Sequence, residues 1–530
     1  MNVHQVPVPF VLMIAAVSGF FTDWAFPDRN LWGLAFVGIA GLWLATWKRH
    51  SGVSFVAGWV WGLAFFLPHI RWAEYAVGGA LPWVALSVVQ GLYIGVFAWA
   101  WSFAARSRFL RGSFARQSFA FATLWVAVEY LRMTTPFGGF PWGRLGFSQS
   151  ESPIARLAWL GGIPLTSFAV ALIGALLGVL VLGLIRLNLV SIGSAGLGAV
   201  IMLASGFLIP LDTQAQQGML TVGGVQGNVE NPGLGAFANR QEVLNNHVAG
   251  THQLAGQPGL DLVVWPENGT DIDPQADAGA AALIDAAARD VGVPVLLGAQ
   301  EYPDSGGRYN VSLLWQEGQG VTGRYVKQHP VPFGEYIPFR DFFRRLSPAV
   351  DLISTDMLPG EQPSILDVPI DSLDRDVRVS PIICFEVGYD NIIYDAVKRG
   401  GEVLIVQTNN ASFGHTNEST QQLAMSRLRA IETGRAVIHV STVGVSAVYT
   451  PHGVEKVRTG HFTAEQFVQR VALRTSLTPA VRLGIAPTVV AGGASVLLVV
   501  TGIIDARHRS RTRGAARPRP SRKEAAVRKG

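Results

Sequence analysis

Three polar residues at the ends of apolar runs could together carry out covalent catalysis. The run L-V-V-W-P-E ends in Glu267, the segment R-Y-V-K ends in Lys327, and the run V-S-P-I-I-C ends in Cys384. A cysteine thiolate is a strong nucleophile, a carboxylate can take the thiol proton and return it, and an ammonium group can stabilise the oxyanion of a tetrahedral intermediate. These residue types therefore predict chemistry through a covalent cysteine intermediate.

Each of these residues also has an ordinary structural interpretation. Cys384 is the only cysteine, which excludes an intrachain disulfide framework and a Cys-rich zinc site. It could be a small buried hydrophobe, Glu267 could cap the next helix, and Lys327 could be a solvated surface residue. A helix predicted from about Asn391 could instead direct backbone N–H groups at the thiol. The set of Glu, Lys and Cys, together with Glu335, favours the catalytic interpretation.

The segment from about Gly218 must position these residues, and its pattern predicts an α/β domain because short β-rich runs alternate with helical patterns. The polar groups, among them Asn409 and Asn410, follow strands, where open α/β sheets place their chemistry. The pattern contains no Walker-type loop, dinucleotide fingerprint, metal-ligand cluster or repeat, so it predicts no cofactor and no metal. The predicted strands are 220–225, 261–265, 293–299, 310–316, 379–385, 402–408, 436–441 and 446–450, and the predicted helices are 237–254, 275–290, 391–399 and 418–432.

The composition of the chain indicates a membrane protein. The 530 residues have a mean hydropathy of +0.30 and only 15% are charged, against about 25% in soluble domains. The three apolar runs at 163–185, 189–211 and 483–504 each have at least 22 uncharged residues, enough to cross a bilayer core of about 30 Å. We predict eight membrane spans, at 8–21, 31–47, 53–67, 80–103, 119–130, 163–185, 189–211 and 483–504.

The distribution of basic residues predicts the orientation. One set of loops together with the segment 506–530 carries 17 Lys and Arg residues, against 5 in the opposite loops, which places both termini in the cytoplasm. The prediction is a transmembrane domain at 1–211 with about seven helices, an extracytoplasmic catalytic domain at 218–475, a last span at 483–504 and a basic, unfolded cytoplasmic tail at 506–530. The tail carries a charge of +9 and the rest of the chain −4, which argues against a nucleic-acid partner.

Several motifs resemble those of known enzymes. The runs W-P-E at 265–267, Y-V-K at 325–327, V-P-F-G-E-Y-I-P at 331–338 and C-F-E at 384–386 resemble the nitrilase superfamily. With the predicted spans and the loop F-P-W-G-R-L-G-F-S-Q at 140–149, the chain resembles the apolipoprotein N-acyltransferase family. The resemblance implies an eight-helix transmembrane domain with an inserted αββα-sandwich domain, in which Glu267 is the general base, Lys327 the oxyanion stabiliser and Cys384 the nucleophile.

The resemblance also implies supporting residues, and the chain departs from the family pattern at some of them. The supporting residues are Glu335, Glu386, Asn409, Asn410 and Phe385. The family often has Tyr where this chain has Phe385. The family's N-D-A-W-F-G becomes N-N-A-S-F-G at 409–414, which removes a carboxylate and an aromatic residue. The aromatic loop at 137–147 is a candidate lipid-contacting lid, or alternatively an ordinary interfacial belt.

The activity implied by the resemblance is a ping-pong acyl transfer in a bacterial cell membrane. A membrane phospholipid would donate the acyl chain to the cysteine as a thioester, and the α-amine of the diacylglyceryl-cysteine of an apolipoprotein would accept it. The alternative enzyme is a membrane-tethered amidase of the nitrilase superfamily, for which eight spans would be excessive. A transporter or scaffold with an inactive domain is a third interpretation, disfavoured because the Glu-Lys-Cys set is complete.

Overall fold

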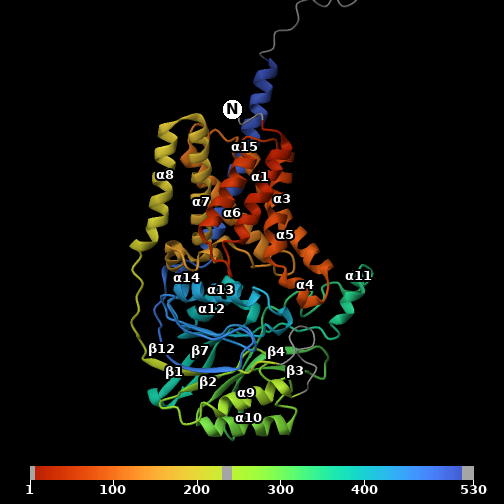
Figure 1. Cartoon of the computed structure of the whole chain (residues 1–530), viewed down its shortest axis with the longest axis vertical. Coiled ribbons are helices and arrows are strands. Elements are labelled where there is room, and N and C mark those ends of the chain that lie inside the picture. The colour runs from red at the N-terminus through yellow and green to blue at the C-terminus, as the bar shows by residue number, and fades with distance from the viewer. Residues whose placement is uncertain (1–5, 230–240, 516–530) are drawn as a thin grey trace, which may run out of the picture.

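The computed structural model describes residues 6–229 and 241–515 and has two parts. Apolar helices stand side by side at one end, and a layered α/β domain forms the other (Figure 1). The N-terminus and the end of the last helix lie at the same end of the molecule, away from the α/β domain (Figure 1). An even number of passes through the helical part accounts for this arrangement.

In the described part of the chain, a helix occupies each of the eight predicted apolar runs. Five are long and apolar enough to cross a membrane, namely α3, α5, α7, α8 and α15, whereas α1 and α2 are shorter. Helix α6 carries Arg116, Glu129 and Arg132 within its length. Length and composition therefore support five of the eight predicted crossings. The bounds are α1 (Val8–Asp23), α2 (Gly33–Thr46), α3 (Ser51–His69), α5 (Ala80–Ala104), α6 (Phe114–Thr134), α7 (Leu157–Arg186), α8 (Leu189–Ala204) and α15 (Ala486–Ala515), with the short α4 (Trp72–Val77) before α5.

Helix α15 extends beyond its apolar part to Ala515, so residues 506–515 are helical where the sequence predicts an unfolded tail. Once a helix has formed, each added residue gains one hydrogen bond, and Ala and Arg have high helix propensity. Asp505 also holds this stretch in place through a 3.1 Å ion pair with Arg108. The remaining part of the predicted tail, 516–530, lies outside the described residues.

The α/β domain contains two six-stranded mixed sheets. The first has the order β12-β1-β2-β3-β4-β5 and the second β11-β10-β9-β8-β7-β6. In each sheet three neighbouring strands are parallel, β1-β2-β3 and β7-β8-β9, and the outer pairings are antiparallel. The bounds are β1 (Met219–Gln226), β2 (Leu262–Val264), β3 (Val295–Glu301), β4 (Tyr309–Gln316), β5 (Gly320–Val326), β6 (Leu366–Ile370), β7 (Arg375–Ile383), β8 (Val403–Thr408), β9 (Val437–Ser441), β10 (Ala447–Tyr449), β11 (Glu455–Arg458) and β12 (Glu465–Ala472).

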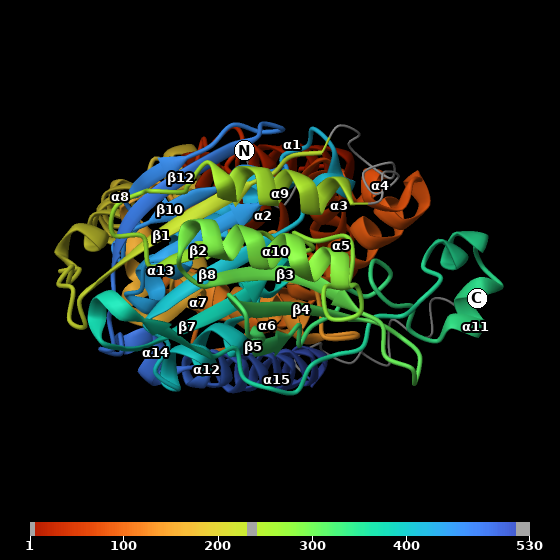
Figure 2. The ribbon, with the colours of Figure 1, turned by 90° about the horizontal axis from the view of Figure 1, so that it is seen from below.

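Apolar side chains hold the layers together. One buried cluster joins residues of both sheets, such as Val264 of β2 and Ile405 of β8. A second cluster packs the other face of the first sheet against α9 (Glu242–His252) and α10 (Ala278–Val291), which cover it in Figure 2. Helices α12 (Asp390–Lys398) and α13 (Glu418–Thr433) cover the second sheet on the side of the apolar helices (Figure 1). The part 237–240 of the first predicted helix lies outside the described residues.

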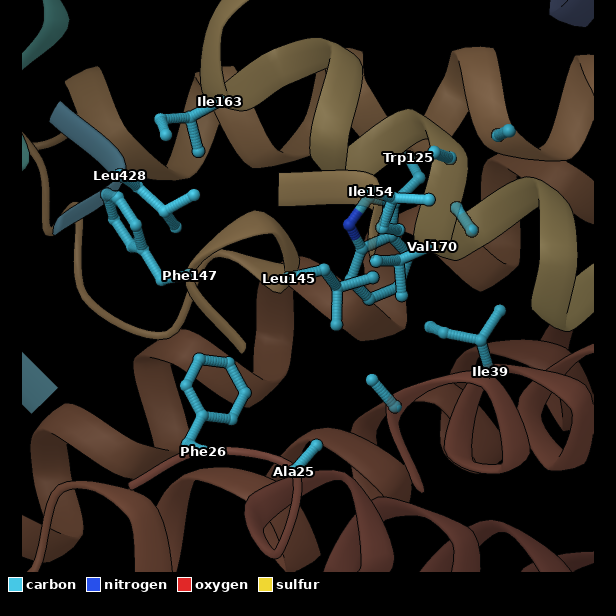
Figure 3. Packing of buried hydrophobic residues seen from close by; sticks show 14 of the residues in the cluster. Ala25, Phe26, Ile39, Trp125, Leu145, Phe147, Ile154, Ile163, Val170 and Leu428 are labelled. Atoms are coloured by element: carbon cyan, nitrogen blue, oxygen red, sulfur yellow. The ribbon is translucent and has the colours of Figure 1, made fainter. Parts of the chain in front are cut away.

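The apolar helices and the α/β domain share one continuous core. Phe147 lies against Leu428 of α13, close to Ile163 of α7 (Figure 3). Phe140 and Trp142, from the loop predicted as a lid, are 9% and 0% exposed. The lid interpretation is therefore wrong for Phe140, Trp142 and Phe147, which are buried at the junction between the two parts, whereas Phe137 is 38% exposed.

A buried group of charges crosses the same junction. Arg144 donates to Asp390 at 2.7 Å, and Arg429 of α13 donates to the same carboxylate at 2.8 Å. Arg429 also pairs with Glu432, whose Oε1 accepts the backbone N–H of Ile163 at 3.0 Å. We call Arg144, Asp390, Arg429 and Glu432 the interface cluster. It ties α12 and α13 to the apolar helices.

Candidate active site

The predicted catalytic residues meet where strands of the two sheets end. Glu267 follows β2, Lys327 follows β5 and Cys384 follows β7. Strand β5 is antiparallel to β4, which is antiparallel to β3, so β5 runs in the same direction as β2. Strands β2 and β5 therefore end on the same side of the first sheet. The second sheet faces the first, and its strand β7 brings Cys384 to the same place.

Lys327 is completely buried and paired with two carboxylates. Its Nζ donates to Glu267 Oε1 at 3.2 Å and to Glu335 Oε1 at 2.6 Å. Burial alone would lower the pKa of Lys327, but the charges of Glu267 and Glu335 outweigh it and raise that pKa above its usual value. The lysine is therefore a fixed cation, and its interpretation as a solvated surface residue is wrong. We call Glu267, Lys327 and Glu335 the active-site cluster.

Glu267 is positioned by three donors from three different elements. Besides Lys327, its Oε1 accepts from the Asn310 side chain of β4 at 2.7 Å, and its Oε2 accepts from the Asn409 backbone N–H at 2.8 Å. Helix α10 is capped by Asp277, so Glu267 does not cap the helix that follows it. The carboxylate is only 4% exposed, and these donors fix its orientation as a general base requires.

Cys384 occupies a tight turn directly after its strand. Its φ of 52° lies in the left-handed region, and the turn Cys384–Gly388 is a single 3₁₀ segment. This turn separates the thiol from α12, which begins at Asp390. Desolvation and the charge of Glu267 raise the pKa of the thiol well above its usual value, while Lys327 lowers it. The thiol therefore needs help to ionise, and Glu267 and Lys327 are both close enough to act on it.

Glu386 joins the turn of Cys384 to the segment that carries Lys327. Its carboxylate accepts the backbone N–H groups of Ile383 at 2.8 Å and Gln328 at 2.6 Å, and the Tyr325 hydroxyl at 3.0 Å. Burial raises the pKa of Glu386 to about 7. Its position supports a structural role in holding the nucleophile turn.

Two of the other predicted supporting residues take different roles. Phe385 does not face the cluster: its ring stacks on Trp142 with centroids 5.3 Å apart and an interplanar angle of 10°. Asn410 is buried and donates to Glu418 Oε2 at 2.6 Å.

Glu335 also accepts the Val331 backbone N–H at 2.7 Å, which closes the loop that carries Glu335 against Lys327.

Three residues that the sequence interpretation missed belong to this site. Gln422 of α13 donates to Cys384 Sγ at 3.6 Å, and Asn310 binds Glu267. Glu418 is buried beside Asn410, and burial raises its pKa to about 8. Asn310 is the second residue of β4, and Glu418 and Gln422 belong to α13. None of the three follows an apolar strand, as Glu267, Lys327 and Cys384 do, so position in the sequence gives no signal for them. Buried polar side chains on otherwise apolar faces were the available clue.

Comparison with known proteins identifies the family of the chain. Residues 18–176 match the apolipoprotein N-acyltransferase N-terminal domain, and residues 221–479 match the carbon-nitrogen hydrolase domain. The apolipoprotein N-acyltransferase of Mycolicibacterium smegmatis is 36% identical over 516 residues, covering 92% of this chain and 84% of the relative. This chain belongs to the apolipoprotein N-acyltransferase family. The family member of Azotobacter vinelandii is 32% identical, covering 89% of this chain and 91% of the relative.

Solved structures of an amidase resemble part of this chain. A variant of the amidase of Nesterenkonia AN1, from the nitrilase superfamily, matches with 16% identity and a TM-score of 0.38, covering 52% of this chain and 95% of the amidase. In this member of the apolipoprotein N-acyltransferase family, the two mixed sheets lie within the residues that match the carbon-nitrogen hydrolase domain, and they are combined with several apolar helices.

Proposed function

We propose that this protein is an acyltransferase that N-acylates apolipoproteins by way of a thioester on Cys384. A membrane phospholipid is the acyl donor, and the α-amine of a diacylglyceryl-cysteine is the acceptor. Family membership supports lipoprotein N-acylation. The observation that carries the mechanism is the buried ion pair of Lys327 with Glu267, set beside Cys384, a residue of intermediate burial.

The reaction proceeds in two half-reactions at one site. Glu267 takes the Cys384 proton, the thiolate attacks the acyl ester carbonyl, and Lys327 stabilises the oxyanion. The ester C–O bond then breaks, and the lysophospholipid leaves with the proton returned by Glu267. In the second half-reaction Glu267 takes a proton from the acceptor amine, the amine attacks the thioester, and the C–S bond breaks to regenerate the thiol.

The surroundings of the site suit substrates that reside in a bilayer. The short turn Ala411–Phe413 follows Asn410 directly, and the Phe413 ring contacts Trp72 of α4 with centroids 5.3 Å apart. The active-site edge thus meets the helical part of the molecule. A lipid ester or a lipidated amine held in the outer leaflet could reach the thiol there without leaving the membrane.

A mass measurement tests the thioester. Incubation with phospholipid alone should increase the protein mass by one acyl group, and hydroxylamine or a diacylated lipopeptide should remove the adduct. Cys384→Ala should abolish the adduct, and Cys384→Ser should give little, because a hydroxyl ionises far less readily than a thiol. Release of free fatty acid without an adduct would indicate a lipid hydrolase. Cleavage of a soluble amide with phospholipid untouched would indicate the tethered amidase.

We also propose that all eight apolar helices cross a bacterial cell membrane, with both termini cytoplasmic and the αββα sandwich outside. The charge bias of the loops and the position of the termini at one end of the molecule (Figure 1) support this. A phosphatase fused after Gln217 should be active and one fused after Ala506 inactive. The reverse pattern would contradict the topology.

A further inference from the structure

The side chain of Gln422 is the feature from which this inference starts. It extends from α13 toward the nucleophile, and its Nε2 lies 3.6 Å from Cys384 Sγ. The residue is completely buried. Only the nitrogen end of an amide can donate a hydrogen bond to sulfur, whereas its oxygen end carries a partial negative charge and would repel a thiolate. The effect of Gln422 on the thiol therefore depends on which end of the amide faces it.

Asn410 determines which way this amide points. Its Nδ2 donates to Gln422 Oε1 at 3.1 Å and to Glu418 Oε2 at 2.6 Å, so both of its N–H groups are used. With its oxygen held by Asn410, the Gln422 amide directs its N–H groups at Cys384.

The Asn410 side chain is itself held in one orientation. Its Oδ1 accepts the Thr408 hydroxyl at 3.0 Å and the Ser441 hydroxyl. Ser441 Oγ already accepts the Gly444 backbone N–H at 2.9 Å, so its hydrogen is free to point at Asn410. The carboxyl of Glu418 supplies the acceptor on the other side. A chain of buried hydrogen bonds thus runs from Glu418 through Asn410 and Gln422 to the sulfur.

We propose that Gln422 is a further catalytic residue, which donates a hydrogen bond to the Cys384 thiolate, and that Asn410 is the positioning residue that orients it. This role rests on Cys384 being the nucleophile proposed above. It also accounts for an asparagine at position 410, because an aspartate there would have no hydrogen to offer Gln422 Oε1. The amide would then turn and present its oxygen to the sulfur.

Alkylation of the thiol by iodoacetamide measures this role without any acyl transfer. The chain has one cysteine, so the rate of alkylation against pH reports on the ionisation of Cys384 alone. Among the described residues, the charged groups that act on this thiol are Glu267, Lys327, Glu335 and Glu418. Substitutions at Gln422 leave all of them in place.

We expect Gln422→Met to raise the pH midpoint of alkylation by about one to two units, the effect of losing one hydrogen bond to a charged group. The isosteric Gln422→Glu should raise the midpoint at least as much. If the methionine variant does not fold, the glutamate variant provides the test. Asn410→Asp should shift the midpoint in the same direction. The neighbouring Gln421 bonds to Trp72 and Trp142 and not to the sulfur, so Gln421→Met is the matched control and should leave the midpoint unchanged.

Two results would overturn the proposal. Wild-type midpoints in both Gln422 variants would show that this amide does not act on the thiolate. A wild-type midpoint in Asn410→Asp would show that Asn410 does not orient it. The proposed function is tested separately, by the acyl-transfer activity of Cys384→Ala. If that variant retains acyl transfer, the proposed function is wrong, whatever the alkylation profiles of the Gln422 variants show.

Discussion

Two groups of largely buried charges in the described part of the chain differ in what lies beside them. The active-site cluster places one cation between two carboxylates next to the Cys384 thiol. The interface cluster alternates arginines and carboxylates, and its members bind backbone groups, such as the Val387 and Gly388 carbonyls that accept from Arg429 at 2.8 and 3.0 Å. The first can serve a reaction, whereas the second fastens two parts of the chain together. Burial of charge alone does not distinguish catalysis from assembly.

This comparison predicts that substitutions in the two clusters have separable effects. A change in the active-site cluster should slow acyl transfer by the protein that remains folded, even where it also destabilises the fold. A change in the interface cluster should destabilise the fold and leave the thiol chemistry of the folded protein unchanged. Lys327→Met and Asp390→Asn test this separation, and Glu418→Gln and Phe385→Leu test residues that lie beside the two clusters.

Lys327→Met should reduce the rate of acyl-enzyme formation by roughly 10²–10³-fold, the usual loss for one oxyanion-stabilising donor. It should also reduce stability, by about 3–5 kcal/mol, because Glu267 and Glu335 lose their buried partner. Single-turnover assays on the folded fraction, together with thermal unfolding in detergent, separate the two effects. Lys327→Arg is the matched control, since it keeps the charge but alters its geometry. It should recover more stability than rate. A wild-type rate in Lys327→Met would remove the lysine from the mechanism.

Asp390→Asn should destabilise the protein by about 3 kcal/mol, because two buried arginines lose a shared carboxylate. The reacting groups are not touched, so the folded variant should show the wild-type pH midpoint of Cys384 alkylation. A large shift in that midpoint, with little loss of stability, would show that the interface cluster acts on the chemistry of the thiol and does not serve assembly alone.

The two clusters also differ in how far the sequence reveals them. Glu267, Lys327 and Cys384 stand at the ends of apolar strands, within motifs that resemble a known superfamily. The interface cluster joins Arg144 to Asp390, which are 246 positions apart, and no local pattern pairs them. Nothing in the loop F-P-W-G-R-L-G-F-S-Q at 140–149 indicates that Arg144 is buried, yet it is 1% exposed. Long-range pairing is fixed by the packing of the two parts, which a single sequence does not state.

The strands show the same limit. All eight predicted strands of the α/β domain correspond to strands in the structure, but β5, β6, β11 and β12 were not predicted. These four are the edge strands of the two sheets. An edge strand is less buried than a central one, so it does not need a continuous apolar run. In β11 the pattern is E-K-V-R and three of its four residues are exposed, which explains why hydrophobic patterning missed it.

Glu418→Gln should change how stability depends on pH. Burial raises the pKa of Glu418 to about 8 from an ordinary value of 4.5. Its neutral form stabilises the fold fully below pH 4.5, and this contribution is lost as the pH rises through about 8, by up to about 1.4 kcal/mol per pH unit. Thermal unfolding between pH 5 and 8 should therefore show a smaller loss for the variant than for the wild type. Glu386 titrates in the same window in both proteins, so the difference between them isolates Glu418. Parallel curves would contradict the assignment.

Phe385→Leu should have the smallest effect, and it tests whether the residue next to the nucleophile belongs to the chemistry or to the junction. The Phe385 ring stacks on Trp142, and such aromatic pairs contribute about 0.5–1.5 kcal/mol beyond the area they bury. The variant should therefore unfold at a slightly lower temperature while its folded fraction forms the acyl-enzyme at close to the wild-type rate. A double-mutant cycle with Trp142→Phe measures the pairing directly, and we expect a coupling energy of about 1 kcal/mol. A coupling energy near zero combined with a large fall in rate would place Phe385 with the active-site cluster, because the ring would then influence the thiol through the turn of Cys384 and not through its contact with the helical part.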